Sequence, residues 1–422
     1  PNPFTTSTLQ QEASKKLNFS TQKTMRLAQQ LYEGVDIQGK GTIGLITYLR
    51  TDSVRVSEEA QAATKAYISE HYGANYIGEA KAKKEPQRRI QDAHEAIRPT
   101  DITLSPVIVK ESLPRDLFRL YQLIYHRFLA SQMQPAVYQT TALKIYAADE
   151  KFTATASRLS FDGFLSVYKP DEETETTGTF QGIEKNTVLQ LKQFEDKQHF
   201  TQPPAHYTEA LLVKTLEELG IGRPSTYAPT ITTIMNRHYI VKEQKNLYVT
   251  ELGEAVNQMM MKAFPVIVDV EFTANMESLL DSVEEGTVQW KTIIENFYPD
   301  LDAAVKQAEK ELEHVKIEDE VTDVPCDVCG RNMVIKYGPH GKFLACPGFP
   351  ECRNTKPYYE KIGVACPKCG KEIVVRKTKK GRRYYGCEDN PNCDFMSWQK
   401  PSKTPCPECG GIMVEKGNKL VC

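Results

Sequence analysis

The sequence predicts an α+β chain of several domains, with two winged-helix-like units, a β-rich connector between them and four-cysteine modules at the C-terminal end. Three observations lead to this prediction. The chain has 422 residues, which is more than one compact domain usually holds. Its apolar residues follow a helical period in some stretches and the two-residue period of strands in others. All eleven cysteines lie between Cys326 and Cys422.

Composition and charge narrow the function. With 40% apolar and 26% charged residues, the chain has the balance of ordinary globular protein. No apolar run approaches the roughly 20 residues that a membrane-spanning helix needs, so we expect no membrane partner. A net charge of -2 argues against a generally basic protein that coats DNA. The chain starts at Pro1 without a signal peptide, so we expect an N-terminal part to be missing.

Residues 1–134 are predicted to form the first winged-helix-like domain. Two helices are expected within residues 6–33, with Ser20 as the N-cap of the second. Their apolar stripes have helical spacing: Leu9, Ala13 and Leu17, then Met25, Ala28 and Leu31. A glycine-containing stretch then leads into an apolar strand that ends at Tyr48. Helix, turn, helix and strands in this order are typical of a winged helix.

Residues 135–204 change to the pattern of β-strands. Three segments alternate apolar and polar residues with a period of two: YQTTALKIYAA, KFTATASRL and NTVLQLKQF. An acidic loop rich in threonine, DEETETTGT, separates the second segment from the third. We therefore expect a connector built mainly of strands.

Residues 205–320 repeat the helix-turn-helix outline. A helix is expected over residues 208–219, with an inward face formed by Leu211, Leu212, Leu216 and Leu219. The GIGRP turn ends this helix, and Ser225 is expected to cap a second one, which carries Tyr227, Ile231 and Ile234. The polar turn KEQKN between two short strands is expected to be the wing.

Two winged-helix-like units in one chain make nucleic acid the leading partner, although such units also serve as protein-docking modules. Residues 255–315 have helical periodicity again. An acidic linker over roughly residues 317–324 then leads to the cysteine-containing modules.

The cysteines repeat with a nearly fixed spacing. Cys326-x2-Cys329-x16-Cys346-x5-Cys352 is followed by Cys366-x2-Cys369-x17-Cys387-x5-Cys393, and then by Cys406-x2-Cys409-x12-Cys422. Four thiolates with no open position are typical of structural Zn²⁺, so we predict zinc ribbons over residues 321–360, 361–403 and 404–422. Iron–sulfur or redox cysteines are the alternative. The third ribbon has three ligands, so we expect a fourth cysteine soon after the last one and weaker zinc binding there.

The second ribbon is strongly basic. Residues 361–403 hold eleven Lys and Arg against four Asp and Glu, an excess of seven positive charges. Aromatic residues lie among and near the basic ones: Phe343, Tyr358, Tyr359, Tyr384, Tyr385, Phe395 and Trp398. Cations that follow a phosphate backbone and rings that stack on bases suit single-stranded nucleic acid. The alternatives are a solvated basic surface and the small cores of the ribbons.

The stretch GLITYLRTDS, residues 44–53, carries the first candidate for catalysis. Its last four residues, 50–53, suit a phosphate and follow Tyr48 closely. A free phenol has a pKa of about 10, so a tyrosine nucleophile needs help at neutral pH. Arg50 would share a face with Tyr48 in a continuing strand and could stabilise a phosphodiester in its transition state. Packing of Tyr48 in an apolar core is the alternative.

QDAHEAIRPT, residues 91–100, supplies His94, Glu95 and Arg98 but lacks the HExxH spacing of a metalloprotease. His94 could donate a hydrogen bond to a phosphate oxygen or tune a nearby protonation. The alternative is an ordinary interior histidine.

GIGRPSTYAPT, residues 220–230, places Arg223 beside the hydroxyls of Ser225 and Thr226 at a predicted helix N-terminus. Helix N-termini attract phosphates, so these groups form a candidate anion site. Simple capping by Ser225 is the alternative, and it is compatible with anion binding.

PFTTSTLQQEAS, GLITYLRTDS, DAHEAIRPT and GIGRPSTYA, followed by four-cysteine ribbons, closely resemble bacterial DNA topoisomerase I of the type IA class. The tandem ribbons favour topoisomerase I over its siblings, topoisomerase III and reverse gyrase. The resemblance implies that Tyr48 attacks a phosphodiester of single-stranded DNA and becomes joined to the 5′-phosphate. Another strand then passes, and the 3′-hydroxyl reverses the bond. Negatively supercoiled DNA would be relaxed in this way without ATP.

The resemblance also implies roles for individual residues and segments. DNA contacts are implied for Arg50, His94, Arg98, Arg223, Ser225, Thr226 and Arg237. Arg50 and His94 also join Tyr48 in the implied catalytic set. The β-rich connector would be the arch of a torus-shaped core, and the ribbons would hold single-stranded DNA.

The family binds Mg²⁺ through an acidic cluster in an N-terminal Toprim domain, and this chain contains no DxDxE pattern. We therefore expect the Toprim domain to lie before Pro1, and the chain alone to bind single-stranded DNA without relaxing a plasmid. A monomer in the bacterial cytoplasm, associated with the nucleoid, is implied. The alternative function is a non-catalytic winged-helix and zinc-ribbon protein that binds single-stranded DNA.

Overall fold

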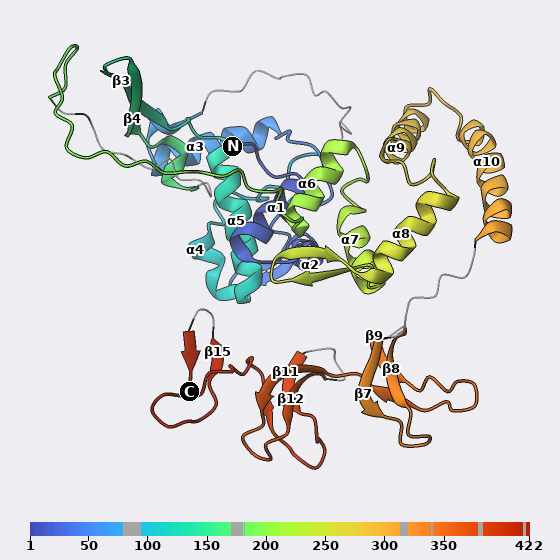
Figure 1. Cartoon of the computed structure of the whole chain (residues 1–422). Coiled ribbons are helices and arrows are strands. Elements are labelled where there is room, and N and C mark those ends of the chain that lie inside the picture. The colour runs from blue at the N-terminus through green and yellow to red at the C-terminus, as the bar shows by residue number, and fades with distance from the viewer. Residues whose placement is uncertain are drawn as a thin grey trace. The chain divides into compact units, whose positions relative to one another are not determined.

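The computed structural model describes residues 1–78, 94–169, 180, 182–312, 320–338, 341–378, 383–416 and 419–422. The chain divides into two compact units, Pro1–Val315 and Lys316–Cys422. The division falls next to the acidic linker predicted over residues 317–324, but that prediction is wrong for residues 320–324, because Glu320–Pro325 forms a strand. Figure 1 shows the course of the chain. The finer division into six domains stays a prediction. None of the helices that the structure describes is long and apolar enough to cross a membrane.

The first unit begins with two helices, as predicted, and a short hairpin takes the place of the predicted glycine-containing stretch. The elements are α1 (Thr6–Glu12), a π-helical turn (Ala13–Leu17), α2 (Thr21–Glu33), β1 (Val35–Ile37) and β2 (Gly41–Ile43). Thr5 caps α1 through a capping box with Thr8, and the Ser20 side chain caps α2 by accepting from the backbone N–H of Lys23. β1 and β2 pair antiparallel.

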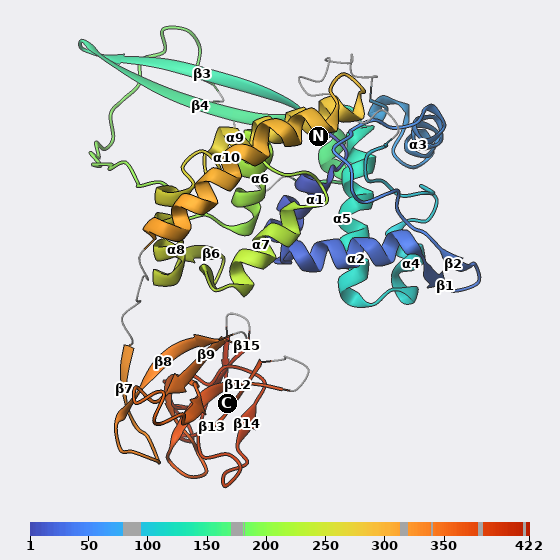
Figure 2. The same cartoon turned by 90° about the vertical axis from the view of Figure 1, so that its right-hand side faces the viewer.

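One long helix organises the core of this region. The elements after the hairpin are α3 (Glu58–His71), α4 (Pro106–Val109), α5 (Arg115–Ser131) and three-residue 3₁₀ turns at Ala74–Tyr76 and Lys110–Ser112. α2 packs on α5, and the two can be followed in Figure 2. Leu120, Ile124 and Phe128 of α5 are buried in a core that also holds Phe4 and Leu45.

A long hairpin follows, with β3 (Val137–Ala147) and β4 (Glu150–Phe161) paired antiparallel. It forms a two-stranded ribbon in Figure 2, and Gly163–Ser166 adds a short 3₁₀ turn. The first two predicted strands of the connector are therefore confirmed. The third, residues 186–194, is wrong, because this stretch has no strand pairing and Val188 is 91% exposed. The acidic loop at 171–179 lies outside the described residues.

The second helical region repeats the order of helix, helix and hairpin. Its elements are α6 (Glu209–Leu219), α7 (Tyr227–Asn236), β5 (Ile240–Glu243), β6 (Asn246–Val249), α8 (Glu251–Ala263), α9 (Val270–Glu284) and α10 (Trp290–Glu311). The helices and the wing are as predicted, but the inward face of α6 is not. Leu211 and Leu219 are exposed, whereas Val213 is fully buried against α7. The inward face of α6 is therefore formed by Val213 with the partly buried Leu212 and Leu216, and not by all four predicted leucines.

The second unit consists of small antiparallel sheets. The first sheet has strand order β10-β9-β8-β7, formed by Thr355–Pro357, Gly341–Ala345, Asn332–Gly338 and Glu320–Pro325. The second has order β11-β12-β13-β14, formed by Glu360–Ala365, Glu372–Lys377, Arg383–Cys387 and Met396–Ser397. A two-stranded sheet of β15 (Val414–Lys416) and β16 (Lys419–Val421) follows. Mixed helices and small sheets with cysteine clusters agree with the predicted fold class.

Candidate active site and metal centres

Tyr48 lies on an irregular loop, not on the strand that the sequence predicts. β2 ends at Ile43, and the following residues exchange hydrogen bonds with several elements in place of one neighbouring strand. The backbone N–H of Leu45 donates to the carbonyl of Leu31 at 2.7 Å, and the N–H of Thr47 donates to the carbonyl of Arg98 at 2.9 Å. The loop is thereby fixed between the end of α2 and the segment at 94–100.

The loop buries its apolar side chains and presents its polar ones. Leu45, Ile46 and Leu49 are almost completely buried, whereas Tyr48 is 37% exposed and Arg50 is exposed. Tyr48 and Arg50 therefore point outward without the strand that was expected to align them. The exposure of Tyr48 also argues against the alternative of a tyrosine in the apolar core.

Two aromatic rings lie next to the ring of Tyr48. The ring centroid of His94 is 5.5 Å away at an interplanar angle of 44°, and that of Tyr32 is 5.5 Å away at 70°. The structure thus brings together Tyr48 and His94, which are far apart in the sequence. Tyr32, in the last turn of α2, was missed by sequence reasoning because a tyrosine at the end of an amphipathic helix gives no signal of its own.

The phosphate-suited residues 50–53 divide into two kinds. Thr51 and Ser53 are buried, and the hydroxyl of Thr51 accepts from the N–H of Ser53 at 3.0 Å. The hydroxyl of Thr6 donates to the carbonyl of Leu49 at 2.7 Å and accepts from the N–H of Thr51 at 2.8 Å. The Thr6 hydroxyl holds the loop against α1, while the hydroxyls of Thr51 and Ser53 accept hydrogen bonds from backbone N–H groups within the loop. Among the described residues, Arg50 has no ion-pair partner, so its guanidinium is available.

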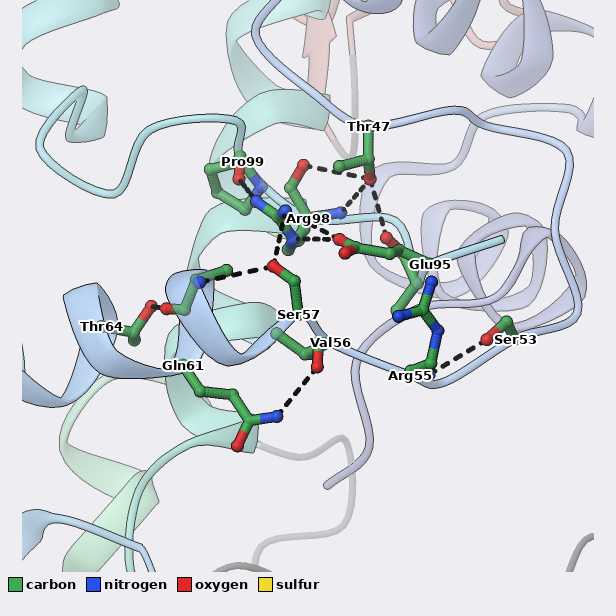
Figure 3. Close-up of polar contacts among 12 residues, drawn as sticks. Thr47, Ser53, Arg55, Val56, Ser57, Gln61, Thr64, Glu95, Arg98 and Pro99 are labelled. Carbon is green, nitrogen blue, oxygen red and sulfur yellow. Dashed lines mark hydrogen bonds and ion pairs between the residues drawn. The ribbon is translucent and has the colours of Figure 1, made fainter. Parts of the chain in front are cut away.

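Arg98 supports the loop from the other side, as Figure 3 shows. Its Nε and Nη2 donate to one carboxylate oxygen of Glu95 at 2.8 and 2.7 Å, and Nη1 donates to the carbonyl of Pro99 at 2.9 Å. The Arg98 backbone N–H donates to Oγ1 of Thr47 at 3.0 Å, and this hydroxyl donates to the carbonyl of Ala96 at 2.7 Å. The guanidinium is therefore engaged within the protein. Thr47, the residue before Tyr48, is a support that sequence reasoning missed.

In the anion site predicted at residues 220–230, the Arg223 guanidinium is also paired with carboxylates of the protein. Nη2 of Arg223 lies 2.7 Å from Asp281, and Nη1 lies 3.5 Å from Glu277, both on α9. Thr226, not Ser225, is the N-cap of α7, and its hydroxyl accepts from the N–H of Arg223 at 2.8 Å. The expected capping by Ser225 is wrong, because the turn closes one residue later and leaves Ser225 exposed.

Arg237 is exposed at the C-terminal end of α7. No hydrogen bond or ion pair between described residues joins this arginine, or the Arg223 turn, to the Tyr48 loop. The structure therefore assembles two groups of predicted site residues: one around Tyr48 and one at the two ends of α7.

The cysteines form three compact clusters in the order that their spacing predicts. The sulfurs within each cluster lie within 4.8 Å of one another: Cys326, Cys329, Cys346 and Cys352; Cys366, Cys369, Cys387 and Cys393; Cys406, Cys409 and Cys422. The closest sulfur pairs are 3.2 Å apart in the first cluster and 3.3 Å apart in the second. A tetrahedral zinc with sulfurs at about 2.3 Å would hold them about 3.8 Å apart, so small adjustments suffice. The donor set fits structural zinc.

Hydrogen bonds and burial shift the pKa values of thiols in the first cluster in opposite directions. The Asn354 side chain donates to the sulfur of Cys326 at 3.2 Å and lowers the pKa of this thiol to about 6. The backbone N–H of Gly348 lowers the pKa of Cys346, but burial and neighbouring thiols outweigh it and raise this pKa to about 12. Zinc must therefore displace protons from some ligands, so its affinity should rise with pH.

A magnesium site is not found in the part of the chain that the structure describes. There, the three groups of candidate ligands are all cysteine clusters, and no cluster of three carboxylates occurs. Thiolates are poor ligands for Mg²⁺, which prefers oxygen. The residues present therefore fit zinc and do not fit magnesium.

The basic surface of the second ribbon is partly neutralised. The four acidic residues in 361–403 all pair with lysines: Lys361 with Glu372 and Glu388, Lys368 with Asp394, and Lys371 with Asp389. These lysines are less available to a polyanion than the sequence indicates. Arg376 instead lies over the ring of Tyr359 at 4.5 Å.

The ribbon aromatics divide into rings packed in the small cores and rings exposed on the surface. Tyr358, Tyr385 and Phe395 pack against the cysteine-containing cores. Trp398 is about half exposed and contacts Tyr384 edge-on with centroids 6.1 Å apart. Phe349 is also exposed, and sequence reasoning missed it. Exposed aromatic rings are suited to stacking on bases.

Comparison with known proteins places these features in one family. A family model described as DNA topoisomerase matches residues 1–295, and one described as topoisomerase DNA binding C4 zinc finger matches residues 323–361, 363–402 and 403–419. Full-length topoisomerase I from Thermotoga maritima is similar in structure, with 37% identity and a TM-score of 0.63. The match covers 89% of this chain and 58% of the Thermotoga chain. The chain belongs to the bacterial type IA DNA topoisomerase family.

Proposed function

We propose that this chain carries the DNA-cleaving tyrosine and much of the DNA-binding surface of an ATP-independent type IA topoisomerase. The observation that carries the proposal is the exposed Tyr48, which lies beside His94 on a loop fixed from two sides. A fixed loop supports catalysis because the nucleophile must be held in line with the scissile bond.

In the proposed reaction, the phenolic oxygen of Tyr48 attacks a phosphorus atom of single-stranded DNA. A bond forms between this oxygen and the 5′-phosphate, the bond to the 3′-oxygen breaks, and the phenolic proton leaves as the 3′-oxygen gains one. Arg50, exposed and unpaired among the described residues, would stabilise the charge on the phosphate. The bond energy stays in the phosphotyrosine, so the 3′-hydroxyl can reverse the step after another strand has passed.

His94 would assist by donating a hydrogen bond to a phosphate oxygen close to the Tyr48 ring. Arg98 is proposed to act mainly through the loop, since its guanidinium already binds Glu95. Arg223, Ser225, Thr226 and Arg237 are proposed to line the path of the strand. For Arg223 this requires DNA phosphates to compete with the carboxylates of Asp281 and Glu277.

The ribbons are proposed to bind single-stranded DNA. Exposed rings such as Trp398 would stack on bases, while nearby lysines and arginines follow the phosphates. Structural zinc would stabilise these small modules.

The magnesium that the family uses is proposed to be bound outside this chain. The chain spans 58% of the length of the Thermotoga protein, and the residues that the structure describes hold no carboxylate cluster. We therefore infer that a Toprim domain on the N-terminal side completes the site. We also propose, from the family resemblance alone, a monomer in the bacterial cytoplasm, at the nucleoid. Its substrate would be negatively supercoiled DNA.

The test compares the chain alone with a protein in which it is joined to an N-terminal Toprim domain. The chain alone should bind a single-stranded oligonucleotide and leave a negatively supercoiled plasmid unchanged in the presence of Mg²⁺. The longer protein should relax the plasmid without ATP, and its Tyr48→Phe variant should not. Full relaxation by the chain alone would contradict the proposed location of the magnesium site.

A non-catalytic protein that binds single-stranded DNA is the second candidate, favoured by the match of the ribbons to the model described as topoisomerase DNA binding C4 zinc finger. It predicts that Tyr48→Phe has no effect on any activity of the longer protein.

A further inference from the structure

The exposed ring of Tyr48 needs a restraint that its own backbone does not provide. A surface tyrosine changes rotamer on a fast timescale, and each rotamer carries the phenolic oxygen to a different place. If Tyr48 is the nucleophile, as proposed above, time spent in other rotamers lowers the rate of attack.

Tyr32 is placed to supply this restraint. Its ring meets that of Tyr48 in an edge-to-face arrangement, with centroids 5.5 Å apart and an interplanar angle of 70°. Edge-to-face pairs at this separation are attractive beyond the area that they bury. His94 contacts the Tyr48 ring as well, at 5.5 Å and 44°, so Tyr48 has two aromatic neighbours.

The backbone fixes the distance between the two tyrosines. Tyr32 belongs to the last turn of α2, and the neighbouring Leu31 is completely buried. The N–H of Leu45 donates to the carbonyl of Leu31 at 2.7 Å. A side chain at Gly44 would place its Cβ 2.7 Å from the carbonyl oxygen of Tyr32, so only glycine permits this approach. The loop that carries Tyr48 is therefore docked directly on the turn that carries Tyr32.

Core packing does not explain Tyr32. It is 40% exposed and is not among the residues of the apolar core. An exposed aromatic ring with one close ring neighbour points to a local role at that neighbour.

We propose that Tyr32 is a positioning residue for Tyr48, and that it acts through the contact of its ring and not through its hydroxyl. This inference rests on the proposed function of Tyr48. Loss of the ring contact should slow covalent attack while leaving the affinity for DNA unchanged, since Tyr32 is not proposed to touch the DNA.

The test uses Tyr32→Ala and Tyr32→Phe in the protein that joins this chain to a Toprim domain. Single-turnover formation of the covalent adduct with a single-stranded oligonucleotide should be roughly three- to tenfold slower for Tyr32→Ala, the range expected for one aromatic pair. Tyr32→Phe keeps the ring and should react at the wild-type rate. Tyr146→Ala, at an exposed tyrosine of the β3–β4 hairpin, is the matched control for losing a surface ring.

A second readout needs no catalysis. With 3-fluorotyrosine at position 48 of this chain, the fluorine resonance should shift for Tyr32→Ala and stay in place for Tyr32→Phe. Unchanged adduct formation in Tyr32→Ala, or equal losses in both variants, would overturn the positioning role. A Tyr48→Phe protein that still forms the adduct would instead overturn the proposed function, so the two failures are distinct.

Discussion

The two units of the chain are stabilised by different means. Pro1–Val315 contains an apolar core around α5, in which Leu120, Ile124 and Phe128 are almost completely buried. Lys316–Cys422 has only small clusters, and most of their buried members are cysteines. A ribbon of about 40 residues cannot bury enough apolar area to fold alone, so metal must supply the difference. The comparison predicts that one unit responds to core mutations and the other to zinc.

Of the changes that distinguish the two units, zinc removal should have the largest effect on stability. Binding of structural zinc contributes on the order of 10–16 kcal/mol in small zinc modules. A strong chelator should therefore unfold the two complete ribbons and leave the helical unit folded. Limited proteolysis followed by mass spectrometry would detect this as rapid cleavage confined to the region after Lys316.

Cys346→Ser offers the same test without a chelator, and it should lower the zinc content by one ion per chain. Val328→Ala, at an exposed position in the same ribbon, is the control. Ribbons that stay resistant to protease after complete zinc removal would contradict the metal-based account.

A core truncation should have the second largest effect, and in the other unit. Leu120→Ala removes a fully buried side chain from α5, which should lower the free energy of unfolding by about 2–5 kcal/mol. Urea denaturation followed by helical circular dichroism would measure the loss. Val107→Ala, at a highly exposed position, should change it by less than about 0.5 kcal/mol. Zinc content should be the same in both variants, and a loss of zinc in Leu120→Ala would show that the units are not independent.

Within the first unit, the two helical regions meet through a buried carboxylate. The core around α5 has no described member after Tyr168, and the cluster around Val213 is separate from it. Glu209 of α6 is 1% exposed, and it accepts from the N–H and hydroxyl of Thr21 at 2.8 and 2.9 Å. It also accepts from Nζ of Lys242 at 2.6 Å.

Glu209→Gln should therefore lower the free energy of unfolding by about 1–3 kcal/mol, because the charge-assisted bonds to buried donors are weakened. Glu218→Gln on the same helix removes only an exposed pair with Lys214 and should cost less than about 1 kcal/mol. Urea denaturation would compare the two variants. Equal stability of the two variants would mean that this contact contributes little.

The smallest expected effect concerns an exposed ion pair. The hydrogen bond from Lys23 holds the pKa of Asp116 below its usual value. A depressed carboxyl pKa stabilises the folded state above the unfolded pKa of about 3.9, and this stabilisation is lost as the pH falls through the folded pKa. Because both side chains are partly exposed, the effect should stay below about 1 kcal/mol.

Lys23→Met should therefore lower the melting temperature slightly at pH 6 and by less at pH 2.5, because the ion pair is lost as the pH falls through the depressed folded pKa of Asp116. Lys110→Met, at another exposed lysine, should show no such pH-dependent difference. A Lys23→Met deficit of the same size at both pH values would show that charge is not its cause.

Sequence patterns correctly predicted the structural features that depend on residues close together in the chain. The helix pairs, the Ser20 cap, the wing and the cysteine clusters all follow from spacing within a few dozen residues. The prediction of a strand at residues 186–194 was wrong, because alternating apolar and polar residues show that a segment could pair as a strand but not that a partner strand is present. The strand at Tyr48 failed for a related reason, since its backbone partners come from α2, α1 and the segment at 94–100.

The sequence predicted only part of the candidate site. The sequence predicted Tyr48, Arg50 and His94, and the structure places His94 against the Tyr48 ring. It could not show that Arg223 is held by carboxylates of α9, because this pairing depends on a tertiary contact. The partner of Arg98, Glu95, lies only three residues away, but the sequence does not show that the two side chains pair. Tyr32 and Thr47 were missed because their contacts are tertiary as well.

The most direct test of the account is to identify the atom that DNA becomes bonded to. The protein that joins this chain to a Toprim domain would be denatured during its reaction with a single-stranded oligonucleotide, digested and analysed by mass spectrometry. The account predicts a nucleotide attached through its 5′-phosphate to the peptide that contains Tyr48. Attachment to any other residue, or DNA cleavage with no attached peptide, would contradict it.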